Sequence, residues 1–149
     1  MAYERRNYQV EAIAACLEAF TARKRESVLL ESPVGSGKTY MALEIIHRFQ
    51  ESLGHRIKVG WVAPRRLLLQ QTMEANRDLY QDDIRPISLF ERMPPEVDMV
   101  VLDEAHHEAT QSCVILYEKL RAKWTLGLSA TPEARNNTVY SVWATELFD

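Results

Sequence analysis

Cysteines, long apolar runs and a basic excess are all scarce in this chain of 149 residues, and each scarcity excludes a class of protein. The two cysteines, Cys16 and Cys113, lack the spacing of a metal site. Both fall in segments with a helical pattern, so we expect small buried hydrophobes and no disulfide. The apolar stretches are short and residues 1–9 carry charges, which argues against a signal peptide or a membrane span. We therefore expect a cytoplasmic protein with no membrane partner.

The net charge of −3 lacks the basic excess of proteins that hold nucleic acid by electrostatics alone. Any nucleic-acid contact must therefore be local. The best candidate is the pair Arg65-Arg66, ahead of Arg5-Arg6 and of the run Arg23-Lys24-Arg25, which is more typical of a solvated face. With 46% hydrophobic and 26% charged residues, the composition is that of a globular protein, and the length fits one domain over residues 1–149.

Apolar strand patterns and amphipathic helix patterns alternate along the chain. Helical periodicity covers residues 8–24, 41–53, 65–80 and 108–121, and strand patterns cover residues 27–30, 57–63, 87–90, 97–102 and 124–128. This alternation predicts an α/β fold with a mainly parallel sheet and helices on both faces. In such a fold, ligands bind at the carboxyl ends of the strands.

The segment after the first strand has the residues of a phosphate-binding loop, Ser32-Pro33-Val34-Gly35-Ser36-Gly37-Lys38-Thr39. Glycines let successive backbone N–H groups point at phosphates, and the helix behind adds its dipole. Lys38 would place its ammonium against the terminal phosphates and Thr39 would bind magnesium. Ser32 stands where the common pattern has glycine, and a small residue fits there. The segment therefore predicts a nucleoside triphosphate and Mg²⁺ as ligands.

Two adjacent acids, Asp103 and Glu104, follow the apolar residues 99–102, where a buried strand would deliver them to the sheet edge. Asp103 would hold magnesium, and Glu104 would orient and deprotonate the attacking water, a role worth about 10²- to 10⁴-fold. Alone, the pair would be read as a solvated strand end; the loop upstream makes it part of a nucleotide site. The neighbouring His106-His107 pair has no ligand at zinc-site spacing.

With both motifs, the chain resembles the first RecA-like domain of superfamily 2 helicases and translocases. The similarity is to the DEAH-type branch that includes restriction-enzyme motor subunits and DNA-repair helicases. Five motifs stand in family order: Arg6-Asn7-Tyr8-Gln9, the phosphate loop, Val62-Ala63-Pro64-Arg65-Arg66 with Gln70, Asp103-Glu104-Ala105-His106, and Leu126-Gly127-Leu128-Ser129-Ala130-Thr131-Pro132. In the first motif, Asn7 replaces the family's proline.

The resemblance implies ATP as the nucleotide, with adenine recognised by Gln9 and Arg6. It implies that Arg65, Arg66 and Gln70 contact a nucleic-acid backbone. His106, Ser129 and Thr131 would then couple hydrolysis to strand movement.

The same resemblance implies a three-layer phosphate-loop fold and a second RecA-like domain, in cis or in trans, that supplies arginines to the nucleotide. The chain has no room for that domain, so we expect weak ATP hydrolysis in isolation. DNA is the expected partner ahead of RNA, by family analogy. Two alternatives stay open: a nucleotide-dependent binding or regulatory module without turnover, and a phosphate-loop ATPase of another family with no nucleic-acid role.

Overall fold

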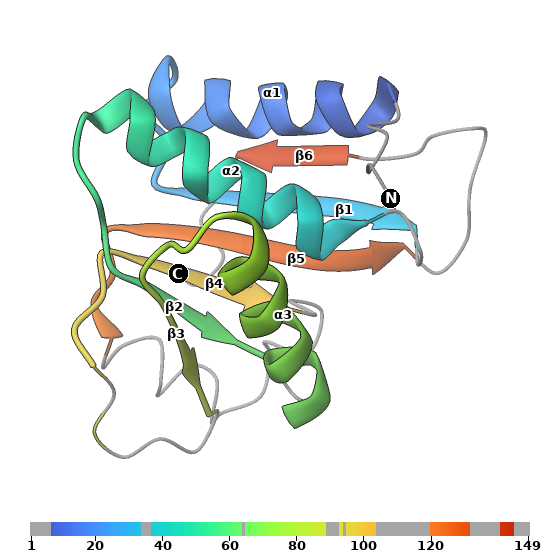
Figure 1. Cartoon of the computed structure of the whole chain (residues 1–149). Helices are drawn as coiled ribbons and strands as arrows, with labels where there is room; N and C mark the ends of the chain where they lie inside the picture. The colour runs from blue at the N-terminus through green and yellow to red at the C-terminus, as the bar shows by residue number, and fades with distance from the viewer. Residues whose placement is uncertain are drawn as a thin grey trace.

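A computed structural model describes residues 7–33, 37–63, 65–88, 93, 95–103, 120–131 and 141–144. Its helices are α1 (Asn7–Thr21), α2 (Lys38–Leu53) and α3 (Arg66–Leu79). Its strands are β1 (Ser27–Pro33), β2 (Val59–Val62), β3 (Ile84–Ile87), β4 (Met99–Asp103), β5 (Trp124–Thr131) and β6 (Ser141–Ala144) (Figure 1). The strands form one sheet in the order β3-β2-β4-β5-β1-β6. The predicted α/β class is confirmed.

Every described strand pair is parallel except β1 with β6. The carboxyl ends of β1 to β5 therefore meet at one edge, where their arrowheads gather in Figure 1. The register aligns Pro33 with Thr131 and Asp103 with Leu128. Segments far apart in the sequence thus reach the same edge of the sheet.

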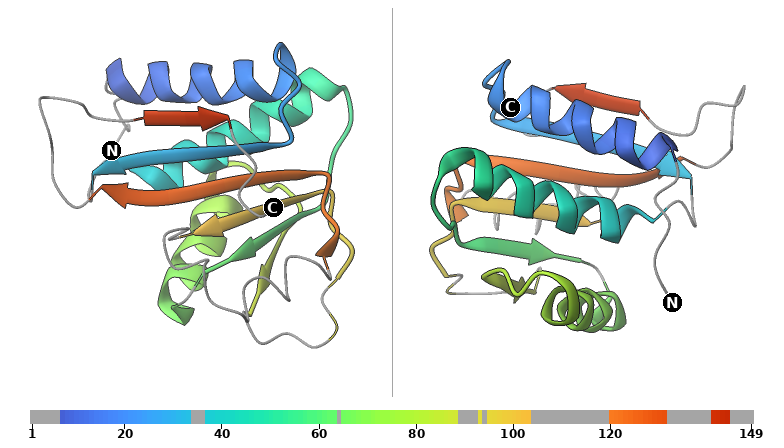
Figure 2. Two further views of the ribbon diagram at one scale, coloured as in Figure 1. Left: turned by 180° about the vertical axis from the view of Figure 1, so that it is seen from behind. Right: turned by 45° about the horizontal axis from the view of Figure 1, so that its top comes forward.

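Both faces of the sheet are buried. Along β4, Met99 and Val101 join the core cluster that includes residues of α1 and α2, whereas Val100 and Leu102 join a cluster on the opposite face. The helices α1, α2 and α3 lie on the first face, as the two views of Figure 2 show. Leu120 packs into the opposite cluster. The rest of the predicted helix 108–121 lies outside the described residues.

Several element boundaries differ from the predicted ones; β1 and β5, for example, each extend three residues further, to Pro33 and Thr131. The helix α1 ends at Thr21, three residues early: the N–H groups of Ala22 and Arg23 both donate to the carbonyl of Glu18 (2.9 and 3.0 Å), and Lys24 then takes a left-handed conformation (φ 52°). The strand β3 spans 84–87 and includes Pro86; it pairs only with β2 among the described strands, so the missing N–H of proline is tolerated. The short strand β6 was not predicted.

Cys16 is free and fully buried in the first core cluster, as the sequence predicted for it. Burial raises the pKa of the Cys16 thiol to about 12, so it behaves as an apolar side chain. Cys113 lies outside the described residues. Among the helices described, none is long and apolar enough to cross a membrane.

Candidate functional site

The predicted phosphate loop joins the end of β1 to the start of α2. Gly37 precedes Lys38 in a left-handed conformation (φ 85°, ψ 38°), which a glycine adopts without the cost that a Cβ would add. Its carbonyl accepts the N–H of Met41 (2.9 Å), the first hydrogen bond of the helix. The strand–loop–helix context predicted for this segment is confirmed, whereas Val34, Gly35 and Ser36 lie outside the described residues.

The amino terminus of α2 is suited to an anion. Its first turn contains no acidic residue, and no side chain caps it, so its positive dipole end faces the loop without a built-in carboxylate. Lys38 and Thr39 are its first two residues, and both are half-buried. The helix thus offers backbone N–H groups, an ammonium and a hydroxyl at one point.

Asp103 ends β4 half-buried at the same edge. The indole Nε1–H of Trp61, on β2, donates to its Oδ2 (3.3 Å). Trp61 is 0% exposed, and a buried indole N–H needs an acceptor. The bond gives the Asp103 carboxylate a buried donor on the neighbouring strand. Sequence reasoning missed Trp61, because its only signal was the polar tip of an otherwise apolar strand residue.

The donor types of Asp103 and Thr39 suit a magnesium ion. The Asp103 carboxylate and the Thr39 hydroxyl are hard oxygen donors of the kind that Mg²⁺ prefers, and a few such protein ligands suffice because the ion keeps water and phosphate oxygens. Glu104 and His106 follow Asp103 and lie outside the described residues.

Ser129 lies on the strand between the phosphate loop and Asp103. In the sheet order, β5 separates β1 from β4. Ser129 is buried, pairs in register with Glu31, and follows Leu128, the partner of Asp103. Thr131 pairs with Pro33 at the end of β1. The strand β5 therefore lies beside both nucleotide motifs, whereas β2, which leads to Arg65 and Arg66, lies on the other side of β4.

Gln9 lies in the first turn of α1. Its side chain is 1% exposed. Arg6, its expected companion in adenine recognition, lies outside the described residues.

The candidate nucleic-acid residues lie at the start of α3, directly after β2. Arg65 and Arg66 are exposed, and no acidic residue stands in the first turn of the helix. Gln70 is also exposed, and its amide donates to Glu74 Oε1 (3.4 Å). Exposed Leu67 lies between them. Two cations at the positive end of a helix favour an anionic partner there.

A polar cluster joins α2 to α3 far from these starts. The carboxylate of Glu44, on α2, is buried; its Oε2 accepts the hydroxyl of Tyr80, and its Oε1 accepts Arg48 Nε (2.8 Å). Both carboxylate oxygens therefore have donors, as a buried charge requires.

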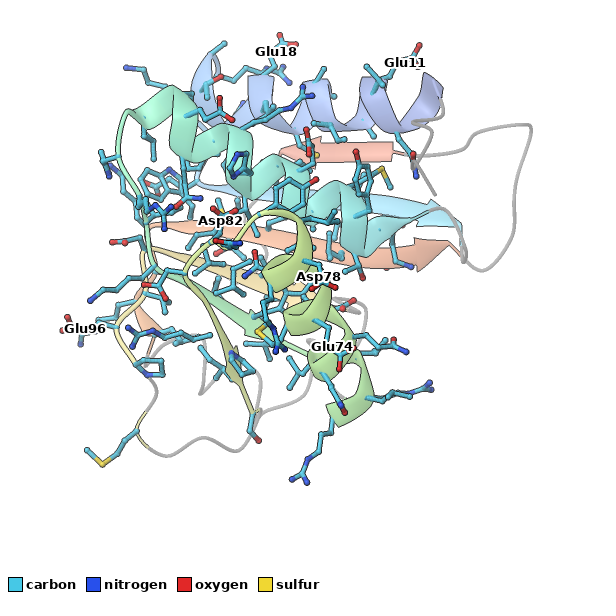
Figure 3. All side chains as sticks on the ribbon, in the orientation of Figure 1. Glu11, Glu18, Glu74, Asp78, Asp82 and Glu96 are labelled. Atoms are coloured by element: carbon cyan, nitrogen blue, oxygen red, sulfur yellow. The ribbon has the colours of Figure 1, made fainter. Side chains whose placement is uncertain are left out.

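The same cluster continues to the loop after α3. Asp82 is buried between the two helices (Figure 3) and lies 3.3 Å from His47 Nδ1. The side chain of Asn76 closes that loop, because its Nδ2 donates to the carbonyl of Asp82 (2.9 Å) and its Oδ1 accepts the Asp82 N–H (3.2 Å). The helix that begins at Lys38 and the helix that begins near Arg66 are thus tied together by side-chain hydrogen bonds.

Replacing Tyr80 with Phe is expected to lower the free energy of unfolding at pH 8 by about 1–2 kcal/mol, since buried Glu44 loses a donor. Burial, then the adjacent Glu44 carboxylate, raises the pKa of the Tyr80 hydroxyl far above its usual 10.0. The native state therefore keeps a proton that the unfolded chain loses, and the stability from Tyr80 is complete below about pH 10 and falls above it. Urea unfolding should show a smaller difference in free energy of unfolding between wild type and Tyr80→Phe at pH 11 than at pH 8. The same difference at both pH values would contradict this role for Tyr80.

Comparisons with known proteins place the fold. The chain shares 28% identity over 158 residues with the type I restriction enzyme EcoAI endonuclease subunit of Escherichia coli, covering 86% of this chain and 19% of that protein. It shares 28% identity over 149 residues with the DNA 3'-5' translocase XPB2 of Sulfurisphaera tokodaii, covering 87% and 31%. Among solved structures, the Sulfolobus solfataricus SWI2/SNF2 ATPase core in complex with double-stranded DNA has a TM-score of 0.68 at 17% identity, covering 91% and 34%.

The fold and the motif order define a RecA-like domain of the superfamily 2 helicase class. Within that class, residues 2–89 match the model of the type III restriction enzyme res subunit, and the chain belongs to that family. The chain spans about a fifth of the length of the first of these relatives and about a third of the length of the second.

Proposed function

We propose that this chain is the ATP-binding motor domain of a DEAH-type superfamily 2 helicase or translocase that moves on DNA. The observation that carries the proposal is the sheet order, in which β5 with Ser129 lies between the phosphate loop after β1 and Asp103 at the end of β4. In a nucleotide-driven motor, the phosphate loop would bind the phosphates and Asp103 would bind magnesium. Ser129 on β5 would transmit the conformational change of hydrolysis to the bound partner.

In this proposal the loop amides and Lys38 hold the terminal phosphates of ATP. Thr39 and Asp103 hold Mg²⁺, which when bound neutralises charge that develops on the phosphates. Trp61 keeps the Asp103 carboxylate oriented toward the edge. Glu104 accepts a proton from the attacking water, and Gln9 with Arg6 binds adenine.

Arg65, Arg66 and Gln70 contact the DNA backbone in the proposed motor. Their exposure and the acid-free first turn of α3 support this role. DNA is preferred over RNA because the relatives include restriction enzymes and a DNA translocase. His106, Ser129 and Thr131 link the two sites.

A second RecA-like domain, in cis or in trans, completes the proposed site with arginines. In related phosphoryl transfer such an arginine contributes about 10³- to 10⁵-fold, so the chain alone turns over ATP slowly.

The test measures steady-state ATP hydrolysis with and without single-stranded oligothymidine in wild type and in the Arg65→Ala/Arg66→Ala double variant. We expect stimulation in wild type and its loss in the double variant, with unstimulated turnover retained. Arg77→Ala, an exposed arginine elsewhere on α3, is the matched control. ATP binding without turnover would favour a regulatory module, and turnover that is indifferent to both DNA and RNA would favour an unrelated ATPase.

A further inference from the structure

A cavity of about 500 Å³ opens at the amino edge of the sheet, opposite the nucleotide site. It lies between the carboxyl ends of α1 and α2 and the starts of β1 and β5, the left side of Figure 1. Its lining includes the deeply buried Phe20 and Phe49, the half-buried Trp124 and Leu53, and the exposed Lys24 and Lys123. Its size falls within the range of small-ligand sites, which are mostly apolar with a few polar groups.

The aromatic side chains of the cavity form one packed unit. The rings of Phe49 and Trp124 meet edge to face with centroids 4.9 Å apart, and Phe20 lies 5.3 Å from Phe49. Lys123 Nζ stands 4.9 Å from the centre of the Trp124 ring. An ammonium and a half-buried indole thus lie together at the cavity, next to the packed rings of Phe20 and Phe49.

The two segments that lead into β1 and β5 at the cavity are basic, although the chain has a net charge of −3. Two acidic residues are also close: Glu26 lines the cavity, and exposed Asp98 accepts the N–H of Lys123 at its backbone carbonyl (2.9 Å). The segments 21–27 and 120–125, which lead into β1 and β5, contain one carboxylate, Glu26, and five exposed cations. The cations are Arg23, Lys24, Arg25, Arg121 and Lys123. Within the part of the chain that the structure describes, neither Lys24 nor Lys123 pairs with a carboxylate. The fold therefore gathers two separate basic segments around one aromatic cavity.

Two of these cations stand on unusual backbone. Lys24 (φ 52°) and Arg121 (φ 48°) adopt the left-handed conformation, which non-glycine residues other than Asn, Asp and His seldom take. These turns present Lys24 and Arg121 on the loops that lead into β1 and β5. These two cations of the basic edge therefore lie in turns of defined backbone conformation beside the cavity.

We propose that this edge is a second binding site, for single-stranded nucleic acid. A base enters the cavity beside Trp124, and the flanking phosphates pair with Lys24, Lys123 and their basic neighbours. Sites for single strands combine cations along the backbone with aromatic rings that hold bases. The choice of nucleic acid as the polyanion rests on the proposed function, whereas the site itself rests on the cavity and its charges. A strand held here lies away from Arg65 and Arg66 and would tether DNA during cycles of ATP hydrolysis.

The test measures binding of fluorescent oligothymidine in the Arg65→Ala/Arg66→Ala background, without nucleotide, over a series of salt concentrations. Lys24→Ala and Lys123→Ala should each weaken binding and lower the slope of log affinity against log salt by about 0.7, the value for one released phosphate contact on a single strand. Trp124→Ala should weaken binding by about 5- to 150-fold. Arg77→Ala, an exposed cation on α3, should change neither quantity.

Two results would overturn the proposal. The first is affinity and salt slope unchanged in both lysine variants, which are exposed and carry the test even if Trp124→Ala fails to fold. The second is displacement of the oligonucleotide by polyglutamate as effectively as by unlabelled oligothymidine, which would show that bases contribute nothing. Failure of the proposed function is a separate outcome, because it appears as ATP hydrolysis that DNA does not stimulate in wild type.

Discussion

Replacing Glu104 with Gln is expected to lower the turnover number for ATP by about 10²- to 10⁴-fold, the usual worth of a positioned general base. Glutamine has the shape of glutamate and can still hydrogen-bond a water, but it cannot accept the proton. MgATP binding should stay close to wild type, because the phosphates are held by Lys38 and the loop. Phosphate release gives the turnover, and a fluorescent ATP analogue gives the affinity.

Glu18→Gln is the matched control, since Glu18 is an exposed carboxylate on α1 that points away from the sheet (Figure 3). It should leave both turnover and affinity unchanged. Intact hydrolysis in Glu104→Gln would show that another group, or no protein group, deprotonates the water.

Replacing Trp61 with Ala is expected to lower the free energy of unfolding by about 3–5 kcal/mol, the usual cost of removing a large buried aromatic side chain. Trp61 is among the largest fully buried side chains and lies on β2, between β3 and β4. A loss of that size is a large share of the 5–15 kcal/mol typical of a domain, so urea denaturation should show a much lower midpoint.

The variant Trp61→Phe separates packing from the positioning of Asp103. Phenylalanine keeps an aromatic ring but has no N–H for Asp103 Oδ2. We expect it to raise the Mg²⁺ concentration needed for half-maximal ATP hydrolysis. Ile13→Val, a buried change on α1, should cost about 0.5–1.5 kcal/mol of stability without shifting the Mg²⁺ requirement. An unchanged requirement in Trp61→Phe would mean that the indole bond does not position the carboxylate.

Local patterns predicted the parts of the fold that depend on neighbours in the sequence. The strand before Gly37 and the helix after it follow from an apolar run, a glycine and a helical period, and the structure has both. The same holds for the apolar strand that delivers Asp103 to the sheet edge. The alternation of strands and helices implied a parallel sheet, because parallel strands are connected by crossover helices. In a parallel sheet, the carboxyl ends of β1 and β4 lie at the same edge.

Features set by pairing between distant segments could not be predicted. The bond from Trp61 to Asp103 depends on the register of β2 with β4, and the Glu44–Tyr80 bond depends on how α2 lies against α3. The run at residues 23–25 looked like a solvated face. It becomes part of a basic edge only because β1 pairs with β5 and brings Lys123 beside it.

Calorimetric titration of MgATP into wild type and Lys38→Ala tests most directly whether this chain holds a nucleotide site at the start of α2. We predict one saturable site per wild-type chain, and affinity about 10- to 150-fold weaker in Lys38→Ala, which loses a charged hydrogen bond to the phosphates. Identical isotherms for the two proteins, or no heat of binding in wild type, would contradict the assignment of the motor's ATP site.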